Sequence, residues 1–160
     1  MAAKLNSMRL LEQHKIPYEA LTYPESAYDA VEVAQILNVP PETVFKTLVV
    51  EPAGSPKPLL AVIPANCQLD LKKLAAAAGV KKVSMTAHKD AERLTGLKVG
   101  GISSLALTQK NWQVYLDQSA ARYEHIMMSA GQRGTQLRLL TAAFIKLVKA
   151  RVADISVCGE

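Results

Sequence analysis

The stretch from Val44 to Val50 limits the possible folds more than any other part of this sequence. Val, Phe and Thr fit the pleated, half-buried surface of a sheet, so the stretch predicts a β-strand. Because side chains alternate along a strand, each of its two faces carries mostly apolar residues. A strand of this kind is covered on both sides, which requires packing layers above and below its sheet.

A single ammonium group lies in the middle of this strand, at Lys46. Burial of an unpaired charge is costly, so Lys46 must reach water, meet an anion or lose its proton. One interpretation is a long side chain that extends to the surface. The other is a cleft whose floor is this strand, with Lys46 facing an anionic or carbonyl-bearing ligand. The residues alone leave both interpretations open.

Hydrophobic periodicity and turn residues predict further elements on both sides of this strand. Helices are predicted at residues 7–16, 30–37, 70–78, 88–95 and 141–150, with Asp29 and Thr141 as caps. Strands are predicted at residues 18–23, 44–50, 59–63, 80–85, 112–116, 125–129, 135–139 and 152–157. The Pro-rich loop 52–58 predicts antiparallel pairing of the two strands beside it. Hairpin steps mixed with helices indicate the α+β class with a mixed sheet.

Length and charge limit the organisation and the partners of the chain. Its 160 residues suffice for one domain with a sizeable core, so we expect a single domain over residues 1–160. The formal net charge of +5 permits a nucleic-acid partner, but the positive residues are dispersed and form no basic tail. No apolar run could span a membrane and no signal-peptide segment is present, so the cytoplasm is the expected location.

Residues that could bind metals or cofactors are sparse in the sequence. Cys67 and Cys158 lie far apart and in no CxxC motif, so we expect neither a zinc site nor a disulfide framework. The three histidines are isolated and are interpreted as surface or capping residues. A Walker loop, a GxGxxG motif and a GxSxG elbow are missing, which disfavours a nucleotide cofactor and a serine nucleophile. The sequence thus predicts no metal and no cofactor.

Two glycine-bearing turns remain as partners for Lys46, at Gly100–Gly101 and at residues 129–134. Glycine lets the backbone approach a ligand closely and lets successive N–H groups point into one concavity. Such donors could hold a carbonyl oxygen or a phosphate. The alternative is that these glycines only form tight turns.

Three segments in order, at residues 44–50, 99–103 and 129–134, resemble the YbaK/EbsC proteins. These are free-standing relatives of the editing domain inserted into bacterial prolyl-tRNA synthetases. The resemblance runs from Ser7 to about Ser156 and includes residues 62–66 and 69–74. It implies a barrel-like mixed sheet flanked by helices, and the deacylation of mischarged tRNA, most of all Cys-tRNA(Pro).

The resemblance also implies a set of site residues. Lys46 matches the functional lysine of the family and is the expected catalytic residue. The expected substrate-binding residues are Gly100, Gly101, Ile102, Ser129, Gly131 and, as a contact for the adenosine, Asn66. The implied partners are tRNA(Pro) and prolyl-tRNA synthetase.

A mechanism follows from these assignments. Lys46 and backbone N–H groups near Gly101 and Gly131 would stabilise charge on the reacting ester. The cysteine thiolate of the substrate would attack its own ester, with Ser129 orienting the thiol. Two positions depart from the family pattern: Ser104 replaces a usual proline, and Gln136 stands where some members carry an acidic residue. These departures bear on amino-acid specificity.

Two other functions are compatible with the sequence. One is a deacylase for another small amino acid, such as alanine, that uses activated water. The other is a non-catalytic module that binds tRNA or a synthetase, and the presence of Lys46 argues against it.

Overall fold

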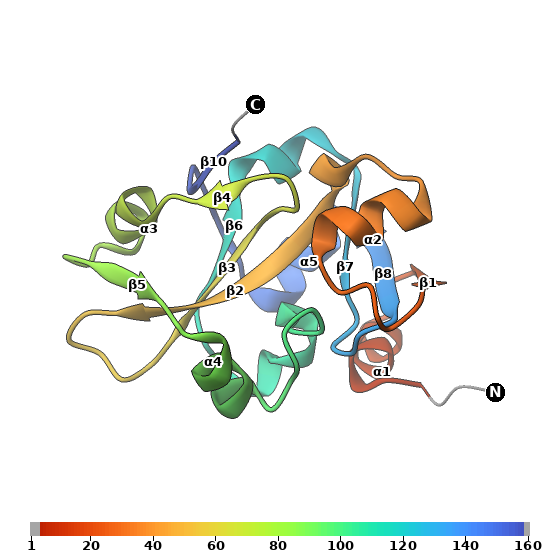
Figure 1. Ribbon diagram of the computed structural model, residues 1–160, viewed down its shortest axis with the longest axis horizontal. Coiled ribbons are helices and arrows are strands. Elements are labelled where there is room, and N and C mark those ends of the chain that lie inside the picture. The colour runs from red at the N-terminus through yellow and green to blue at the C-terminus, as the bar shows by residue number, and fades with distance from the viewer. Residues whose placement is uncertain (1–3, 159–160) are drawn as a thin grey trace.

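The computed structural model describes residues 4–158 of the chain (Figure 1). The predicted α+β class with a mixed sheet is confirmed. The first three and last two residues of the expected domain 1–160 lie outside the described part. The helices are α1 (Asn6–Gln13), α2 (Ala30–Leu37), α3 (Leu71–Ala78), α4 (His88–Thr95) and α5 (Thr141–Val148). The strands are β1 (Tyr18–Thr22), β2 (Val44–Pro52), β3 (Leu59–Pro64), β4 (Gln68–Leu69), β5 (Val83–Met85), β6 (Val114–Asp117), β7 (His125–Ser129), β8 (Thr135–Leu140), β9 (Arg151–Ala153) and β10 (Ser156–Val157).

Strand β2 lies at the centre of the main sheet, whose order is β1-β8-β7-β2-β3-β6-β9. The predicted antiparallel pairing of β2 with β3 is confirmed, with Lys46 opposite Ile63 and Val50 opposite Leu59. On its other edge β2 pairs in parallel with β7 and antiparallel with the short β5. The two-residue strands β4 and β10 form a separate small sheet.

Both faces of β2 are covered, as its sequence predicts. Phe45 and Val49 pack into the largest core cluster together with residues of α1, α4 and α5. On the opposite face, Val44 packs with residues of α2 and β7, and Val50 packs with residues of α3. The helices therefore form layers on both sides of the sheet, with Lys46 on the face shared by α2 and α3 (Figure 1).

The β2 edge that faces away from β3 has a gap. It pairs with β7 at Val44 and Phe45 and with β5 from Val50 onward, so residues 46–49 have no strand partner there within the described chain. Val44 accepts a hydrogen bond from Ala65 on the β3 side, and Val49 accepts one from Thr86 on the opposite side. Since backbone groups of successive residues point to opposite edges, the N–H and C=O of Thr47 face the gap.

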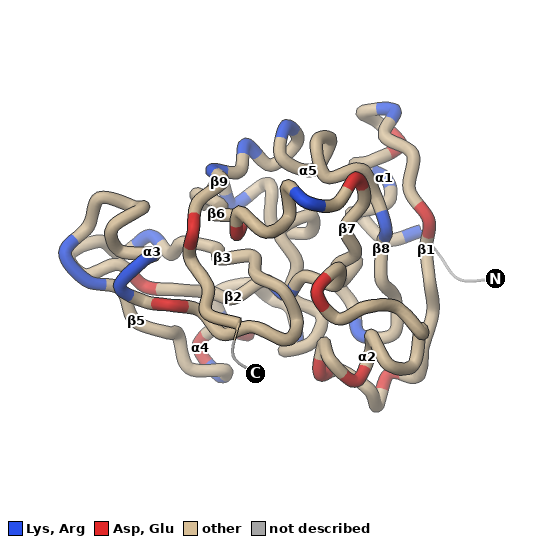
Figure 2. Tube along the Cα trace, turned by 90° about the horizontal axis from the view of Figure 1, so that it is seen from above, with Lys and Arg blue, Asp and Glu red and all other residues tan. Residues whose placement is uncertain are grey.

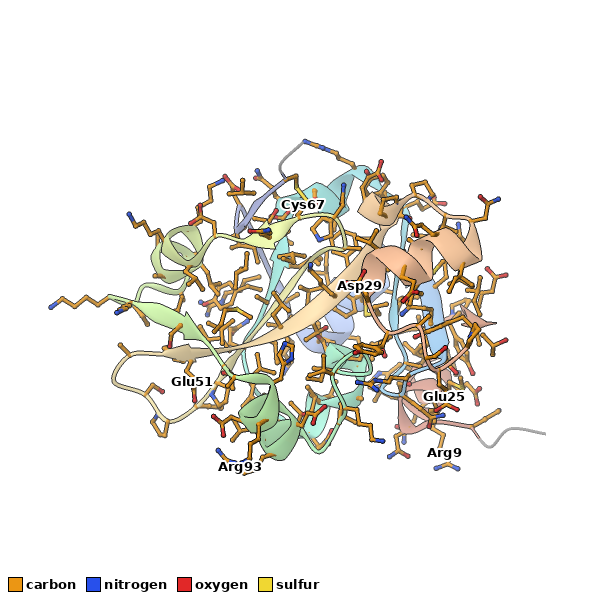
Figure 3. The ribbon with its side chains drawn as sticks, in the orientation of Figure 1. Arg9, Glu25, Asp29, Glu51, Cys67 and Arg93 are labelled. Carbon is orange, nitrogen blue, oxygen red and sulfur yellow. A yellow bond between two sulfur atoms is a disulfide. The ribbon has the colours of Figure 1, made fainter. Side chains whose placement is uncertain are left out.

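The structure corrects the expectation for the cysteines. Cys67 and Cys158 form a disulfide that joins the turn after β3 to the segment after β10 (Figure 3). Pairing of β4 with β10 brings the two residues together, although they are separated by 91 positions in the chain. Cysteine spacing alone does not reveal a contact that depends on two such short strands.

Two local predictions are also wrong. The predicted strand 152–157 is divided into β9 and β10, which belong to different sheets. Thr141 is the first residue of α5 and does not cap it, since its hydroxyl donates to the carbonyl of Tyr123. By contrast, Asp29 caps α2 as predicted, by accepting a hydrogen bond from the N–H of Glu32.

Candidate active site

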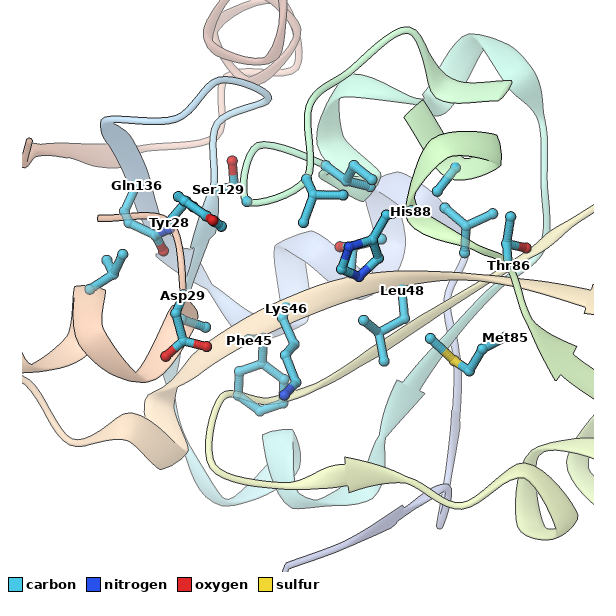
Figure 4. Close-up of a pocket in the computed structure, with 18 residues that line it drawn as sticks. Tyr28, Asp29, Phe45, Lys46, Leu48, Met85, Thr86, His88, Ser129 and Gln136 are labelled. Carbon is cyan, nitrogen blue, oxygen red and sulfur yellow. The ribbon is translucent and has the colours of Figure 1, made fainter. Parts of the chain in front are cut away.

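A cavity of about 300 Å³ lies at the gap in β2 (Figure 4). It is enclosed by β2, the start of α2, the β5–α4 connection, the glycine loop near residue 100 and the ends of β7 and β8. Lys46 and Leu48 lie on one side of the β2 ribbon, whereas His88 and Ser129 lie on the other. The cavity therefore extends around the open strand edge. Its polar and charged lining residues are Tyr28, Asp29, Lys46, Thr47, Thr86, His88, Ser129 and Gln136.

Lys46 is half-buried and lines the cavity. Its Nζ donates a hydrogen bond to the carbonyl of Ala65, at 3.2 Å. Burial lowers the pKa of Lys46 below its ordinary value, and the nearby Asp29 carboxylate acts in the opposite direction. An ammonium group has three N–H donors, so one is used by Ala65 and two remain for a ligand.

Three glycines allow the loops around the cavity to interlock. Gly100 has φ +91°, and a Cβ there would overlap the Cβ of Tyr28. A Cβ on Gly101 would lie 3.1 Å from the backbone of Gln132 and Arg133. A Cβ on Gly131, where φ is +105°, would lie 2.8 Å from the Cβ of Ala106. These contacts are possible only because glycine lacks a side chain.

The backbone donors of two of these glycines are engaged within the protein. The N–H of Gly101 donates to the carbonyl of Lys98 at 2.8 Å, and the N–H of Gly131 donates to Ser129 Oγ at 3.2 Å. The Ser129 hydroxyl accepts that bond and keeps its own proton for a ligand. The backbone donor that faces the cavity is instead Thr47, through the gap in β2.

Comparison with known proteins decides the family. The model of the aminoacyl-tRNA editing domain family matches residues 24–147, which contain the whole cavity. The chain belongs to this family. It is 41% identical over 155 residues to EbsC of Enterococcus faecalis, which carries an inferred Cys-tRNA(Pro)/Cys-tRNA(Cys) deacylase assignment. That alignment covers 96% of this chain and 93% of EbsC, so the YbaK/EbsC resemblance is confirmed.

Solved structures show the same fold at lower identity. The hypothetical protein APE2540 superposes with a TM-score of 0.84 at 21% identity, covering 93% of this chain and 97% of that one. A protein inferred to be a trans-editing enzyme for prolyl-tRNA synthetase superposes with a TM-score of 0.79 at 22% identity. The superposition covers 97% of this chain and 99% of that one. These structures share the α+β fold of this chain. The family match and the similarity to EbsC class the chain as an aminoacyl-tRNA editing protein.

The predicted site residues differ in their position relative to the cavity. Lys46, Gly100, Ile102 and Ser129 line the cavity. Gly101 and Gly131 lie just behind the lining, where they support the loops. Asn66 is exposed in the turn after β3, outside the set of lining residues.

The cavity also contains residues that sequence reasoning missed. His88, interpreted as a surface or capping residue, is exposed and lines the cavity beside β2 (Figure 4). The buried Thr86 Oγ1 and Gln136 Oε1 have no hydrogen-bond partner among the described residues. The Tyr23 hydroxyl and Ser119 Oγ are buried and unpartnered in the same way but lie outside the lining, so these atoms alone do not mark ligand contacts. Isolated His, Thr and Gln residues give no motif that would reveal these positions.

Across residues 4–158, no group of three or more His, Cys, Asp and Glu side chains could hold a metal ion. Nor does any described helix combine the length and apolar character needed to cross a membrane. Lys and Arg residues are spread over separate parts of the surface, including α5 and the turn before β5 (Figure 2).

Proposed function

We propose that this protein hydrolyses the ester of mischarged aminoacyl-tRNA, with Cys-tRNA(Pro) as its main substrate. The observation that carries the proposal is the half-buried Lys46 in the same small cavity as Ser129 and the Gly100 loop. Membership of the editing family and the similarity to EbsC support the reaction class and the cysteinyl substrate. The proposed partners are tRNA(Pro) and prolyl-tRNA synthetase, which place the activity in the cytoplasm.

In the proposed mechanism, Lys46 and the gap in β2 stabilise the reacting ester. Lys46 has two N–H donors beyond its bond to Ala65, and the N–H of Thr47 faces the strand gap. Both residues line the cavity, where charge develops on the ester carbonyl oxygen in the proposed reaction. A cation held in a partly desolvated site stabilises such charge more strongly than it would in water. The Ser129 hydroxyl donates to the substrate thiolate and orients it.

The proposed attacking group belongs to the substrate. The cysteine thiolate forms a bond to its own ester carbonyl carbon, and the bond from that carbon to the ribose oxygen breaks. The ribose oxygen leaves with a proton as the tRNA hydroxyl. Water then opens the resulting cyclic thioester and yields free cysteine. This route requires a thiol in the substrate and therefore discriminates against amino acids that lack one.

The test is hydrolysis of Cys-tRNA(Pro) by the wild-type protein, by Lys46→Ala and by Lys57→Ala as a control in the exposed β2–β3 loop. Loss of Lys46 should lower kcat/KM roughly 100- to 1,000-fold, in the range found for removing one charge-stabilising donor. Lys57→Ala should match the wild type, and all three proteins should melt at similar temperatures. Retained turnover in Lys46→Ala would remove this lysine from the mechanism.

A panel of mischarged tRNAs tests the substrate, with and without prolyl-tRNA synthetase. Ser-tRNA(Pro) should react much more slowly than Cys-tRNA(Pro), because an alcohol is hardly ionised at neutral pH. Equal rates would favour activated water as the attacker. Faster hydrolysis of Ala-tRNA would point to a different specificity, for which Gln136 in the lining is the first residue to change.

A further inference from the structure

The ring of Tyr28 at the rim of the cavity has no part in the proposed chemistry. Tyr28 is 48% exposed although it lines the cavity. The guanidinium carbon of Arg133 lies 4.0 Å from the ring centroid, so a cation covers one face of the ring. An aromatic ring exposed to this extent still offers apolar surface next to the mouth of the cavity (Figure 4).

This ring is held in place from two directions. The Cβ of Tyr28 packs directly on Gly100, whose missing side chain allows the approach. Arg133 is itself fixed, because its Nε donates to the carbonyl of Val99 at 2.6 Å. The loop that contains Val99 is anchored in turn by a 2.8 Å hydrogen bond from the Val99 N–H to Glu92 of α4. A flat side chain with so many fixed neighbours loses little conformational freedom when a ligand binds to it.

We propose that Tyr28, backed by Arg133, is the stacking surface for the terminal nucleobase of the substrate. The inference rests on the proposed function, in which the aminoacyl ester occupies the cavity and the nucleoside extends through its mouth. At about 300 Å³, the cavity lies at the lower limit of small-ligand sites, which span roughly 300–1,000 Å³. An aminoacyl group with its ribose fills such a space, so the base lies at the rim, where Tyr28 is exposed.

The other aromatic rings of the lining serve this purpose less well. Phe45 is only 2% exposed and belongs to the core. His88 is also exposed, but it lies farther along β2 than Tyr28, toward Thr86 (Figure 4). Single aromatic side chains that stack bases are common in proteins that bind single-stranded nucleic-acid ends, and they accept any base because each base has a π-face.

The experiment compares two cysteine esters, cysteinyl-adenosine and cysteine ethyl ester, which differ in the nucleoside. The variants are Tyr28→Leu, which keeps the Cβ contact with Gly100, Tyr28→Phe, which keeps the ring, and His88→Asn. We expect Tyr28→Leu to raise KM for cysteinyl-adenosine roughly 5- to 100-fold, the loss of one base–aromatic stack, with kcat little changed. KM for the ethyl ester should stay the same, and Tyr28→Phe should behave as the wild type with both esters.

Three results would overturn the stacking surface. These are an equal effect of Tyr28→Leu on both esters, no effect on either ester, and a selective loss for the nucleoside ester in His88→Asn instead. Binding of adenosine 5′-monophosphate, followed by the NMR shifts of its own adenine protons, separates this inference from the proposed function. If the wild-type protein hydrolyses neither these esters nor Cys-tRNA(Pro), the proposed function fails. Adenine shifts that are present with the wild type and abolished with Tyr28→Leu would still support the stacking surface, and their absence with the wild type would reject it.

Discussion

The two sides of the candidate cavity are held together in different ways. On one side, the loop near residue 100, the turn at 129–134 and Tyr28 fit into one another because glycines leave room for backbone contact. On the other side, the turn that accepts the hydrogen bond of Lys46 is tied by the Cys67–Cys158 disulfide to the end of the chain. The first arrangement determines the shape of the cavity, whereas the second holds the turn that carries the Ala65 carbonyl. Changes to the glycine side should therefore alter activity, and changes to the disulfide side should mainly alter stability.

Loss of the disulfide should give the largest change in stability. Cys158→Ser removes a link that closes a 91-residue loop, which the chain-entropy model values at about 4–5 kcal/mol in the free energy of unfolding. Urea unfolding of the variant and of the reduced wild type should agree with each other. Activity at 25 °C should persist, because the turn keeps its hydrogen bonds from Ala65 to Val44 and from Cys67 to Pro64. A variant that unfolds at the same urea concentration as the oxidised wild type would contradict this.

Gly100→Ala should give the next largest loss of stability and should also reduce activity. Its Cβ would overlap Tyr28 and its backbone has φ +91°, so steric overlap and backbone strain together should cost about 3–4 kcal/mol. The control is Gly54→Ala, at φ +80° with nothing within 4 Å of the added Cβ. Only backbone strain applies there, so about 1 kcal/mol is expected. Similar losses in the two variants would show that the contact with Tyr28 is not tight.

Asp117 stabilises the disulfide side through hydrogen bonds, and its contribution to the free energy of unfolding should depend on pH. Burial acts to raise the pKa of this carboxyl, but hydrogen bonds from Ser119, Ile155 and Ser156 outweigh it and lower the pKa below 3.8. The stabilisation is therefore complete above the unfolded-state pKa and is lost as pH falls through the lower folded-state pKa. Asp117→Asn should be less stable by about 2 kcal/mol at pH 7, as for a hydrogen bond to a charged group. The difference in unfolding free energy should shrink toward pH 2, whereas the exposed Asp90→Asn should differ little at either pH.

Substitution of Lys46 should give the smallest change in the free energy of unfolding, and this change should again depend on pH. Its folded-state pKa is lowered by burial, so the unfolded chain binds the proton more tightly. Wild-type stability should therefore rise as pH increases from the folded-state pKa toward the ordinary value of 10.5. Lys46→Met should lack this rise and be at least as stable as the wild type at pH 7, while Lys57→Met should keep it. A marked loss of stability in Lys46→Met would show that the bond to Ala65 outweighs the cost of burying the charge.

Local sequence signals predicted the elements of this fold well. The alternation in residues 44–50, the Pro-rich loop 52–58 and the cap at Asp29 act within a few residues, so their outcome does not depend on the rest of the chain. The strand order was not accessible in this way, since β7 joins β2 and β6 joins β3 in parallel across long connections. The gap in β2, the approach of Cys67 to Cys158 and the position of His88 all depend on that order. The placement of Lys46, Gly100 and Ser129 around one cavity follows the family resemblance, and periodicity alone would not have supplied it.

The missing stretch of strand beside residues 46–49 has a consequence for what can enter the protein. At about 3.3 Å per residue, an opening four residues long measures roughly 13 Å between the strands that border it. The cavity at this opening has a volume of only about 300 Å³, so it holds a group the size of an aminoacyl ester and leaves the rest of a larger substrate outside. Under the proposed function, this strand gap receives the acylated end of a tRNA while the body of the tRNA stays at the protein surface.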